Sequence, residues 1–137
     1  MNEYEAIRRE IDSYLMEQFK YRLSLVYLTP DNIIATRKNS RIGLYLRIRK
    51  VKSIFPPDCL IIARIGFSKE RAGHGTHFVR FLTEIAVKHG FKHIGIESVN
   101  EKSSSFAKKL GFQSIDGSNY MASVEDLVSY FSREEYM

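Results

Sequence analysis

The sequence predicts one α/β domain over residues 1–137, built on a mixed β-sheet with helices packed against it. Three observations lead to this prediction. Residues 42–49 alternate apolar and polar side chains, and residues 59–67 form a nearly continuous apolar run. That run leads through an amphipathic helix into another apolar strand at residues 94–99. Such a strand–helix–strand crossover joins parallel strands.

The first half of the chain predicts a helix followed by antiparallel strands. Its first segment carries apolar residues at helical spacing: Ile7, Ile11, Tyr14, Leu15 and Phe19. We expect strands over residues 23–28 and 33–36, joined by a turn rich in Pro, Asp and Asn. The alternation over residues 42–49 is typical of a strand with one buried face.

The second half predicts the crossover and a closing hairpin. Residues 59–67 are apolar on both faces, as expected of a central strand. The helix after them is expected to end at Gly90 in a left-handed cap. We further predict a short helix from Asn100 to Gly111, a hairpin over residues 112–121, and a last helix over residues 124–131.

The composition is that of a soluble globular protein. Hydrophobic residues make up 44% of the chain and charged residues 27%, which argues against bulk disorder, collagen and coiled coil. The apolar runs are far shorter than the roughly 20 residues that span a bilayer. No signal peptide is visible, so we expect a cytoplasmic protein with no membrane partner. The single cysteine, Cys59, cannot form an internal disulfide and is expected to be a small buried hydrophobe.

Positive charge is concentrated between residues 37 and 52. The net charge is +5, and seven cations lie in this segment: Arg37, Lys38, Arg41, Arg47, Arg49, Lys50 and Lys52. Four residues of the predicted strand share one face: Arg41, Tyr45, Arg47 and Arg49. Cations and an aromatic ring in a row are typical of nucleic-acid-binding sheets. The alternative, which we favour, is a solvated strand whose arginine stems cover apolar surface.

A glycine-containing turn joins the central strand to its helix. Within residues 68–76, Gly73 and Gly75 leave backbone N–H groups uncovered at a helix N-terminus, which favours phosphate oxygens. An ordinary glycine-containing turn is the alternative. The turn lacks the Lys-Ser/Thr ending of a P-loop and the three-glycine dinucleotide fingerprint, which argues against nucleotide hydrolysis and hydride transfer.

Two spacings within residues 59–121 are distinctive when taken together. The turn carries Gly73 and Gly75 one residue apart, and Asn100 precedes Gly111-Phe112 by eleven residues after the following strand. In this order the segment resembles the GNAT superfamily of N-acetyltransferases. The resemblance implies a mixed, mostly antiparallel sheet with helices on both faces. It also implies a transferase in which an amine attacks the thioester of acetyl-CoA directly.

The resemblance further implies which residues hold acetyl-CoA. The strand end at residues 65–67 would offer backbone hydrogen bonds to the pantetheine arm, and residues 71–76 would bind the pyrophosphate. A further two residues would contact the coenzyme from the following elements. The implied positions are Ile65, Gly66, Phe67, Arg71, Ala72, Gly73, His74, Gly75, Thr76, Asn100 and Phe106.

The sequence departs from the family pattern at two positions. Glu70 stands where the family has Gln or Arg, beside Arg71, which can replace that phosphate contact. Ala107 stands where a Tyr often protonates the departing thiolate. A thiol with a reference pKa of about 8.5 is a tolerable leaving group without that Tyr. Tyr120, on the predicted hairpin, is a candidate acid, with a packed sheet tyrosine as the alternative.

Glu97 is the candidate general base. It lies on the strand beside the expected acetyl site, where a carboxylate can act through water. The alternative is a strand glutamate that is ion-paired, with Arg64 as its partner. His74 and His77 share a helix face but lack a third ligand, so no metal site is predicted.

Two functions of different classes follow from these residues. The first is an acetyl-CoA-dependent N-acetyltransferase. Its acceptor is open among protein amines, aminoglycosides, polyamines, small metabolites and aminoacyl-tRNA. The second is a GNAT-like module with weak or absent turnover. It would bind nucleic acid through Arg41, Arg47 and Arg49, or bind an acidic protein.

Overall fold

In a computed structural model, the chain folds as helices packed on one β-sheet. The structure describes residues 3–19, 26–28, 32–36, 42–48, 54–67, 73–97 and 101–134. Within them the elements are α1 (Glu3–Phe19), β1 (Val26–Leu28), β2 (Asn32–Thr36), β3 (Ile42–Arg47), β4 (Cys59–Phe67), α2 (His74–His89), β5 (His93–Ile96), α3 (Glu101–Lys109), β6 (Gln113–Ser114), β7 (Tyr120–Ser123) and α4 (Val124–Glu134). None of the described helices combines the length and the apolar character needed to cross a membrane.

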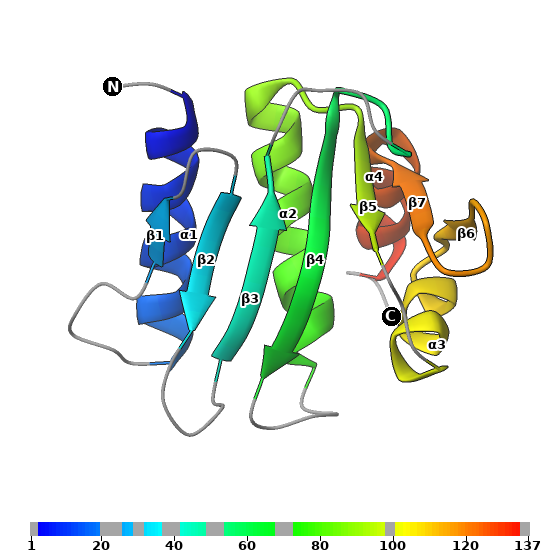
Figure 1. Ribbon diagram of the computed structural model, residues 1–137, viewed down its shortest axis with the longest axis horizontal. Helices are drawn as coiled ribbons and strands as arrows, with labels where there is room; N and C mark the ends of the chain where they lie inside the picture. The colour runs from blue at the N-terminus through cyan, green and yellow to red at the C-terminus, as the bar shows by residue number, and fades with distance from the viewer. Residues whose placement is uncertain are drawn as a thin grey trace.

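The strands form one sheet in the order β1-β2-β3-β4-β5-β7-β6 (Figure 1). Among the described strands, β4 and β5 pair in parallel, and each other neighbouring pair is antiparallel. Helix α2 connects β4 to β5, which confirms the predicted crossover. The mixed, mostly antiparallel sheet is confirmed as well.

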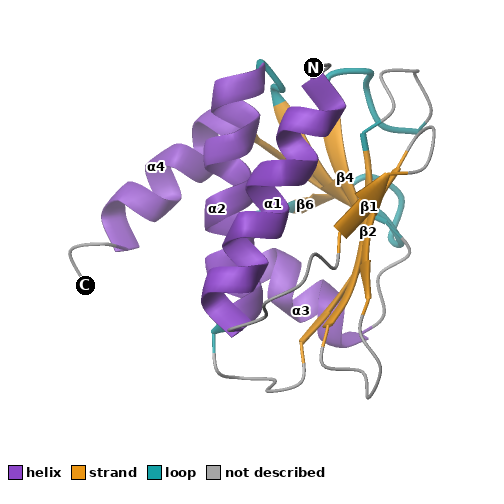
Figure 2. Ribbon diagram, turned by 90° about the vertical axis from the view of Figure 1, so that its left-hand side faces the viewer, coloured by secondary structure: helices purple, strands orange, loops and turns teal. Residues whose placement is uncertain are grey.

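One face of the sheet is covered by helices and carries the main core. Helices α1, α2 and α4 all lie on this face (Figure 2). Their apolar stripes pack against the inward side chains of the sheet, as Ile11, Leu46, Ile62, Phe78 and Leu127 illustrate. The resemblance implied helices on both faces, whereas these three helices share one face. The reason lies in what covers the other face.

The opposite face of the central strands is shielded by Phe55, which is 1% exposed. Its ring packs with Cys59, Ile61 and Met121 in a second, smaller core. Gly95 permits this packing, because a Cβ atom there would lie 2.5 Å from the Phe55 ring. An aromatic ring in the segment before β4 therefore does the covering that was expected of a helix.

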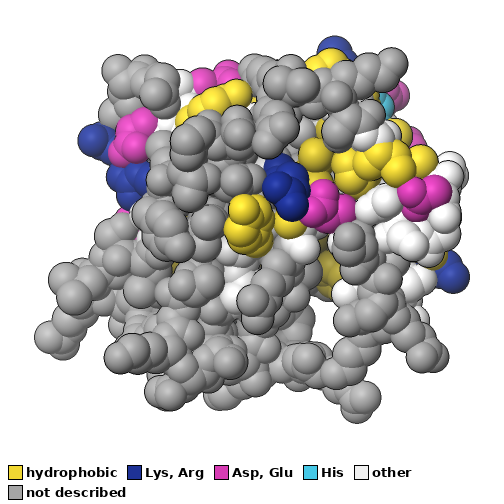
Figure 3. Space-filling model, in the orientation of Figure 1, with side chains coloured by type: hydrophobic (Ala, Val, Ile, Leu, Met, Phe, Trp, Pro, Cys, Tyr) yellow, Lys and Arg dark blue, Asp and Glu magenta, His cyan; other side chains and the backbone are white. Residues whose placement is uncertain are grey.

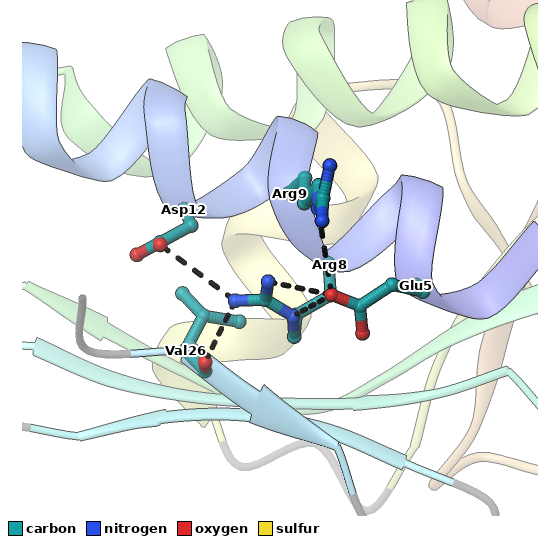
Figure 4. A network of polar contacts seen from close by, with 5 residues as sticks. All are labelled: Glu5, Arg8, Arg9, Asp12 and Val26. Atoms are coloured by element: carbon teal, nitrogen blue, oxygen red, sulfur yellow. Dashed lines mark hydrogen bonds and ion pairs between the residues drawn. The ribbon is translucent and has the colours of Figure 1, made fainter. Parts of the chain in front are cut away.

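Arg8 of α1 forms a hydrogen bond with the edge strand β1 (Figure 4). Its guanidinium donates hydrogen bonds to Glu5 Oε1 at 2.6 and 2.9 Å and to the Val26 carbonyl oxygen at 3.3 Å. It also lies 3.7 Å from the Asp12 carboxylate. The hydrogen bond from Arg8 holds the pKa of Glu5 below its usual value. The contact orients α1 at the β1 edge of the sheet.

Candidate functional site

Pairing between β4 and β5 stops partway along β4. Cys59–Ile62 pair with His93–Ile96, and the amide of Glu97 donates one last hydrogen bond to the Ile62 carbonyl oxygen at 3.0 Å. Beyond that point, Ala63–Phe67 continue without a strand partner on the β5 side among the described residues. Their edge peptide groups can therefore accept an extended ligand as a strand accepts a neighbour.

A β-bulge in β4 lies where the pairing stops. Tyr45 of β3 pairs with Arg64 and the next residue, Leu46, pairs with Ile62, so Ala63 has no counterpart. A bulge bends its strand and increases the local twist. The end of β4 consequently runs away from β5 (Figure 1). We call this divergence of β4 and β5 the fork.

The N-terminus of α2 follows the fork directly along the chain. Gly73 precedes the helix in the left-handed conformation, with φ 80°, which an L side chain rarely adopts. The first amide to bond within the helix is that of His77, which donates to the Gly73 carbonyl oxygen at 2.9 Å. The amides of His74, Gly75 and Thr76 come before it and point out of the helix end.

This helix end favours an anion. Gly73 makes no side-chain cap, and the first turn of α2 contains no acidic residue. The amides of Gly75 and Thr76, which precede the first intrahelical hydrogen bond, and the positive end of the helix dipole therefore favour a phosphate group. The sequence predicted an anion site at this turn, of which the structure describes residues 73–76.

Helix α3 approaches this helix end through Phe106. A Cβ atom on Gly75 would lie 3.3 Å from the Phe106 ring, so the absence of a side chain there allows the two helices to meet. The fork, the N-terminus of α2 and the Phe106 ring therefore surround one region at the carboxyl ends of β4 and β5. In sheets with parallel strands, ligands bind in this position.

Glu97 lies at the end of β5 and pairs with Arg47 of β3. The Arg47 Nε and Nη2 atoms are both 3.0 Å from Glu97 Oε1, and Arg47 Cζ lies 5.4 Å from the centre of the Tyr45 ring. The Glu97 side chain is 22% exposed. Basic and acidic side chains touch in the middle of this face, next to hydrophobic ones (Figure 3). The sequence suggested Arg64 as the ion-pair partner; the partner in the structure is Arg47.

The Oε2 atom of Glu97 makes no hydrogen bond or ion pair with any described residue. The guanidinium thus holds one oxygen of the carboxylate, and among the described residues the other oxygen has no partner. This arrangement fixes the orientation of the carboxylate at the fork. It suits a group that accepts a proton from a positioned partner.

Tyr120 is buried, with 5% exposure, and its ring belongs to the core on the helix face. Its hydroxyl lies 2.9 Å from Ser104 Oγ on α3. Sequence reasoning placed Tyr120 on the closing hairpin but did not single out Ser104. Three consecutive serines occupy residues 103–105, and only the orientation of α3 distinguishes them.

Two other residues singled out by the sequence are buried away from solvent. Cys59 is fully buried, and burial raises the pKa of its thiol to about 12, with a smaller contribution from Asp58. It is a core residue, as predicted. Ala107 of α3 is also fully buried.

Several predicted positions lie outside the described residues. Arg71, Ala72 and Asn100 of the coenzyme set are among them, together with Arg41 and Arg49 of the basic strand. For Ile65, Gly66 and Phe67 the structure describes the backbone as part of β4.

Two surface hollows lie elsewhere in the molecule. One of about 550 Å³ runs between α1 and α2, lined by residues that include Tyr14, Phe81 and Lys88. Another of about 660 Å³ lies between the end of α3 and α4. Neither hollow is lined by a residue of the predicted coenzyme set. The candidate site is therefore defined by the register of β4 and β5 and by the N-terminus of α2.

Comparison with known proteins gives matches in structure alone. No protein-family model matches the sequence, and no curated protein matches it. Among solved structures, AtaTR bound with AcCoA matches with a TM-score of 0.53 and 16% identity, over 85% of this chain and 76% of that one. The KacTA–DNA complex matches with a TM-score of 0.54 and 15% identity, over 91% and 86%.

A protein from Chromobacterium violaceum, described as a probable acetyltransferase of the GNAT family, matches with a TM-score of 0.50 and 16% identity. The match covers 72% of this chain and 62% of that one. At these identities the likeness concerns the fold. The sheet order, the fork and the α2 crossover together with these matches establish that this chain has the GNAT acetyltransferase fold.

Proposed function

We propose that this protein is an acetyl-CoA-dependent N-acetyltransferase. One observation supports the proposal above all: the fork in the sheet leads along the chain to the N-terminus of α2, where Gly73 provides no side-chain cap. The fork suits an extended polar chain, and the N-terminus of α2 suits a pyrophosphate. Coenzyme A contains both groups, joined one after the other. The structural similarity to an AtaTR complex with AcCoA is consistent with this choice of ligand.

In this proposal each part of the coenzyme meets a different element. The pyrophosphate binds the turn of residues 71–76, where the amides of Gly75 and Thr76 precede the first hydrogen bond of α2. The pantetheine arm lies along the backbone of residues 65–67 and hydrogen-bonds to the edge of β4 that has no partner among the described strands. Asn100 and Phe106 contact it from the side of α3. The free backbone amides at the fork are donors that can stabilise an oxyanion on the acetyl group.

The reaction is a direct transfer of the acetyl group. The amine nitrogen attacks the carbonyl carbon, a C–N bond forms, and the C–S bond breaks with its electron pair going to sulfur. Glu97 accepts the proton of the amine, directly or through one water, at the oxygen that Arg47 leaves open. Arg47 acts through Glu97 and is therefore a positioning residue.

The proposal is tested by release of free CoA from acetyl-CoA, followed with a thiol reagent in the presence of spermidine, polylysine and a lysine-containing peptide in separate reactions. We expect amine-dependent CoA release with at least one of these acceptors. Glu97→Gln should lower the rate, while acetyl-CoA affinity stays unchanged. An unchanged rate and pH profile in Glu97→Gln would exclude Glu97 as the base.

The competing proposal is a binding module that uses the basic strand. It is supported by the placement of Arg47 and Tyr45 on the exposed face of β3, and by structural neighbours that include a complex with DNA. Arg47, however, already pairs with Glu97, which reduces the positive charge that it offers to a phosphate. Binding to duplex DNA that weakens steeply between about 50 and 200 mM salt would favour this alternative. Coenzyme binding through fixed backbone amides should depend less on salt.

A further inference from the structure

The hollow of about 550 Å³ between α1 and α2 has a volume typical of sites that bind small molecules. The two helices run side by side (Figure 2), and Glu10 of α1 contacts Lys88 and His89 of α2. The hollow shares no residue with the fork or with the N-terminus of α2. Its lining therefore serves a purpose other than binding acetyl-CoA.

Two stacked aromatic rings line this hollow. Tyr14 of α1 and Phe81 of α2 stack with their ring centroids 4.3 Å apart. Phe78 meets the Tyr14 ring edge-on, with a centroid distance of 5.8 Å, which holds the stack in place. The fold therefore positions the rings before a ligand binds. The Tyr14 hydroxyl makes no hydrogen bond with any described residue.

The two cations that line the hollow are already paired. Arg9 Nε lies 3.6 Å from Glu5 Oε1. Lys88 contacts Oε1 of Glu10, and His89 Nε2 lies 3.2 Å from Oε2 of the same carboxylate. These pairs offset the positive charge beside the hollow and engage both oxygens of Glu10.

Two carboxylates of the hollow have no such partner. Glu17 of α1 and Glu84 of α2 line it, and neither makes a hydrogen bond or an ion pair with any described residue. Glu17 is three positions after Tyr14, so these two side chains share one face of α1. Glu84 lies close enough to act on Tyr14, since burial and the Glu84 charge together raise the pKa of that phenol to about 12. The Tyr14 ring thus has a carboxylate near it from each helix, and the phenol itself stays uncharged.

The hollow and the whole chain differ in the sign of their charge. The chain carries a net charge of +5, yet the two unpaired carboxylates of the hollow are both negative. Stacked rings with a carboxylate on each helix suit a ligand whose middle is apolar and whose two ends are cationic. An inorganic cation would use the carboxylates but not the rings.

We propose that the hollow binds an organic dication in which a methylene chain joins two ammonium groups, as in diamines and polyamines. The methylene groups lie on Tyr14 and Phe81, while one ammonium group pairs with the carboxylate of α1 and the other with that of α2. The Tyr14 oxygen accepts a further hydrogen bond from an ammonium group. Such a cation touches none of the residues assigned to acetyl transfer, so it is a ligand and not the acceptor. The inference does not depend on the proposed function.

The test uses putrescine as the probe and the amide NMR shifts of the isotope-labelled protein as the readout. Titration at low salt should shift amides of the residues that line the hollow on α1 and α2, and the shifts should saturate. n-Butylamine has the same carbon chain with a single ammonium group. One exposed ion pair corresponds to about two- to fivefold in affinity, so putrescine should bind more tightly than n-butylamine by this factor. Mg²⁺ at equal concentration should not displace putrescine.

Three variants and a matched control locate the ligand. Glu17→Gln and Glu84→Gln each remove one exposed carboxylate with little change of shape. Each should weaken putrescine binding about two- to fivefold and remove most of its advantage over n-butylamine. Tyr14→Phe keeps the ring stack, removes the hydroxyl and should also weaken putrescine binding. Glu125→Gln makes the same change in net charge at an exposed position of α4 and should leave the affinity unchanged.

Weaker putrescine binding in Glu17→Gln and Glu84→Gln, with Glu125→Gln normal and putrescine preferred over n-butylamine, supports the inference. Three results would overturn it. They are an absence of saturable shifts with putrescine, shifts confined to other parts of the surface, and equal affinity in all of the glutamate variants. The amide spectrum of each variant shows whether it is folded. Acetyl-CoA binding is measured separately, and its failure would overturn only the proposed function.

Discussion

Thr76 offers a substitution that should stabilise the helix and weaken coenzyme binding at the same time. Its amide is the last of the open amides at the N-terminus of α2, and its side chain is partly exposed. Thr76→Glu places a carboxylate in a first turn that contains no acid. Thr76→Gln has nearly the same shape and no charge, so the difference between the two variants isolates the charge.

The two effects have opposite signs. A carboxylate in the first turn of a helix should raise the free energy of unfolding by about 0.3 to 1 kcal/mol relative to Gln. The same carboxylate would lie within one helical turn of the amides, at about 6 Å from each pyrophosphate charge. The repulsion from each charge is then about 0.7 kcal/mol at the dielectric constant of water and about 1.4 kcal/mol at half that value. Summed over two charges, about 1.4 to 2.8 kcal/mol weakens binding about tenfold to a hundredfold.

The assay is isothermal titration of both variants with acetyl-CoA at low salt and again at about 300 mM salt, together with urea unfolding. The gap in affinity should narrow at the higher salt because the repulsion is screened. One result would refute the placement of the pyrophosphate at this helix end. In it, Thr76→Glu is folded and more stable than Thr76→Gln, yet binds acetyl-CoA as tightly.

Three further predictions concern the fold around the site. Gly95→Ala should lower the free energy of unfolding by about 1 to 3 kcal/mol, since its Cβ would lie 2.5 Å from the Phe55 ring. Urea unfolding tests this, and adding Phe55→Leu to Gly95→Ala should restore part of the lost stability. Gly73→Ala should cost about 1 to 2 kcal/mol because of its positive φ, and calorimetry showing no loss would contradict that conformation. The amide of Ser118 and the amides of Asn119 hold the pKa of Asp116 below its usual 3.8, so Asp116 stabilises the fold above that pH. Asp116→Ala should be less stable than the unmodified protein at pH 7, and urea unfolding should show this gap closing as the pH falls below 3.8.

Local patterns in the sequence predicted the central elements well. The apolar run at residues 59–67 corresponds to β4 residue for residue, and α2 ends before Gly90 in the left-handed cap that was expected. These features depend on residues close together in the chain. The packing of Phe55 against Gly95 was not predictable in this way, because it joins residues forty positions apart across the sheet.

The same distinction between local features and contacts of distant residues applies to the candidate site. The glycine turn was recognisable because left-handed backbone and open amides are local properties of Gly73 and its neighbours. The sequence did not point to Arg47 as a partner of Glu97, since Arg47 is fifty positions away and meets Glu97 only through the order of strands in the sheet. The hydrogen bond between Ser104 and Tyr120 was not predictable, because a choice among adjacent serines needs the orientation of α3 against Tyr120.

The central claim is that the fork and the N-terminus of α2 together bind acetyl-CoA. The most direct test is the melting temperature of the purified protein during titration with acetyl-CoA, with free CoA and ATP titrated alongside. Ligand at about 100 times its dissociation constant should add about 2.7 kcal/mol to the free energy of unfolding. The account predicts a saturable rise with acetyl-CoA and with CoA, and none with ATP. An unchanged melting temperature at millimolar acetyl-CoA would contradict it.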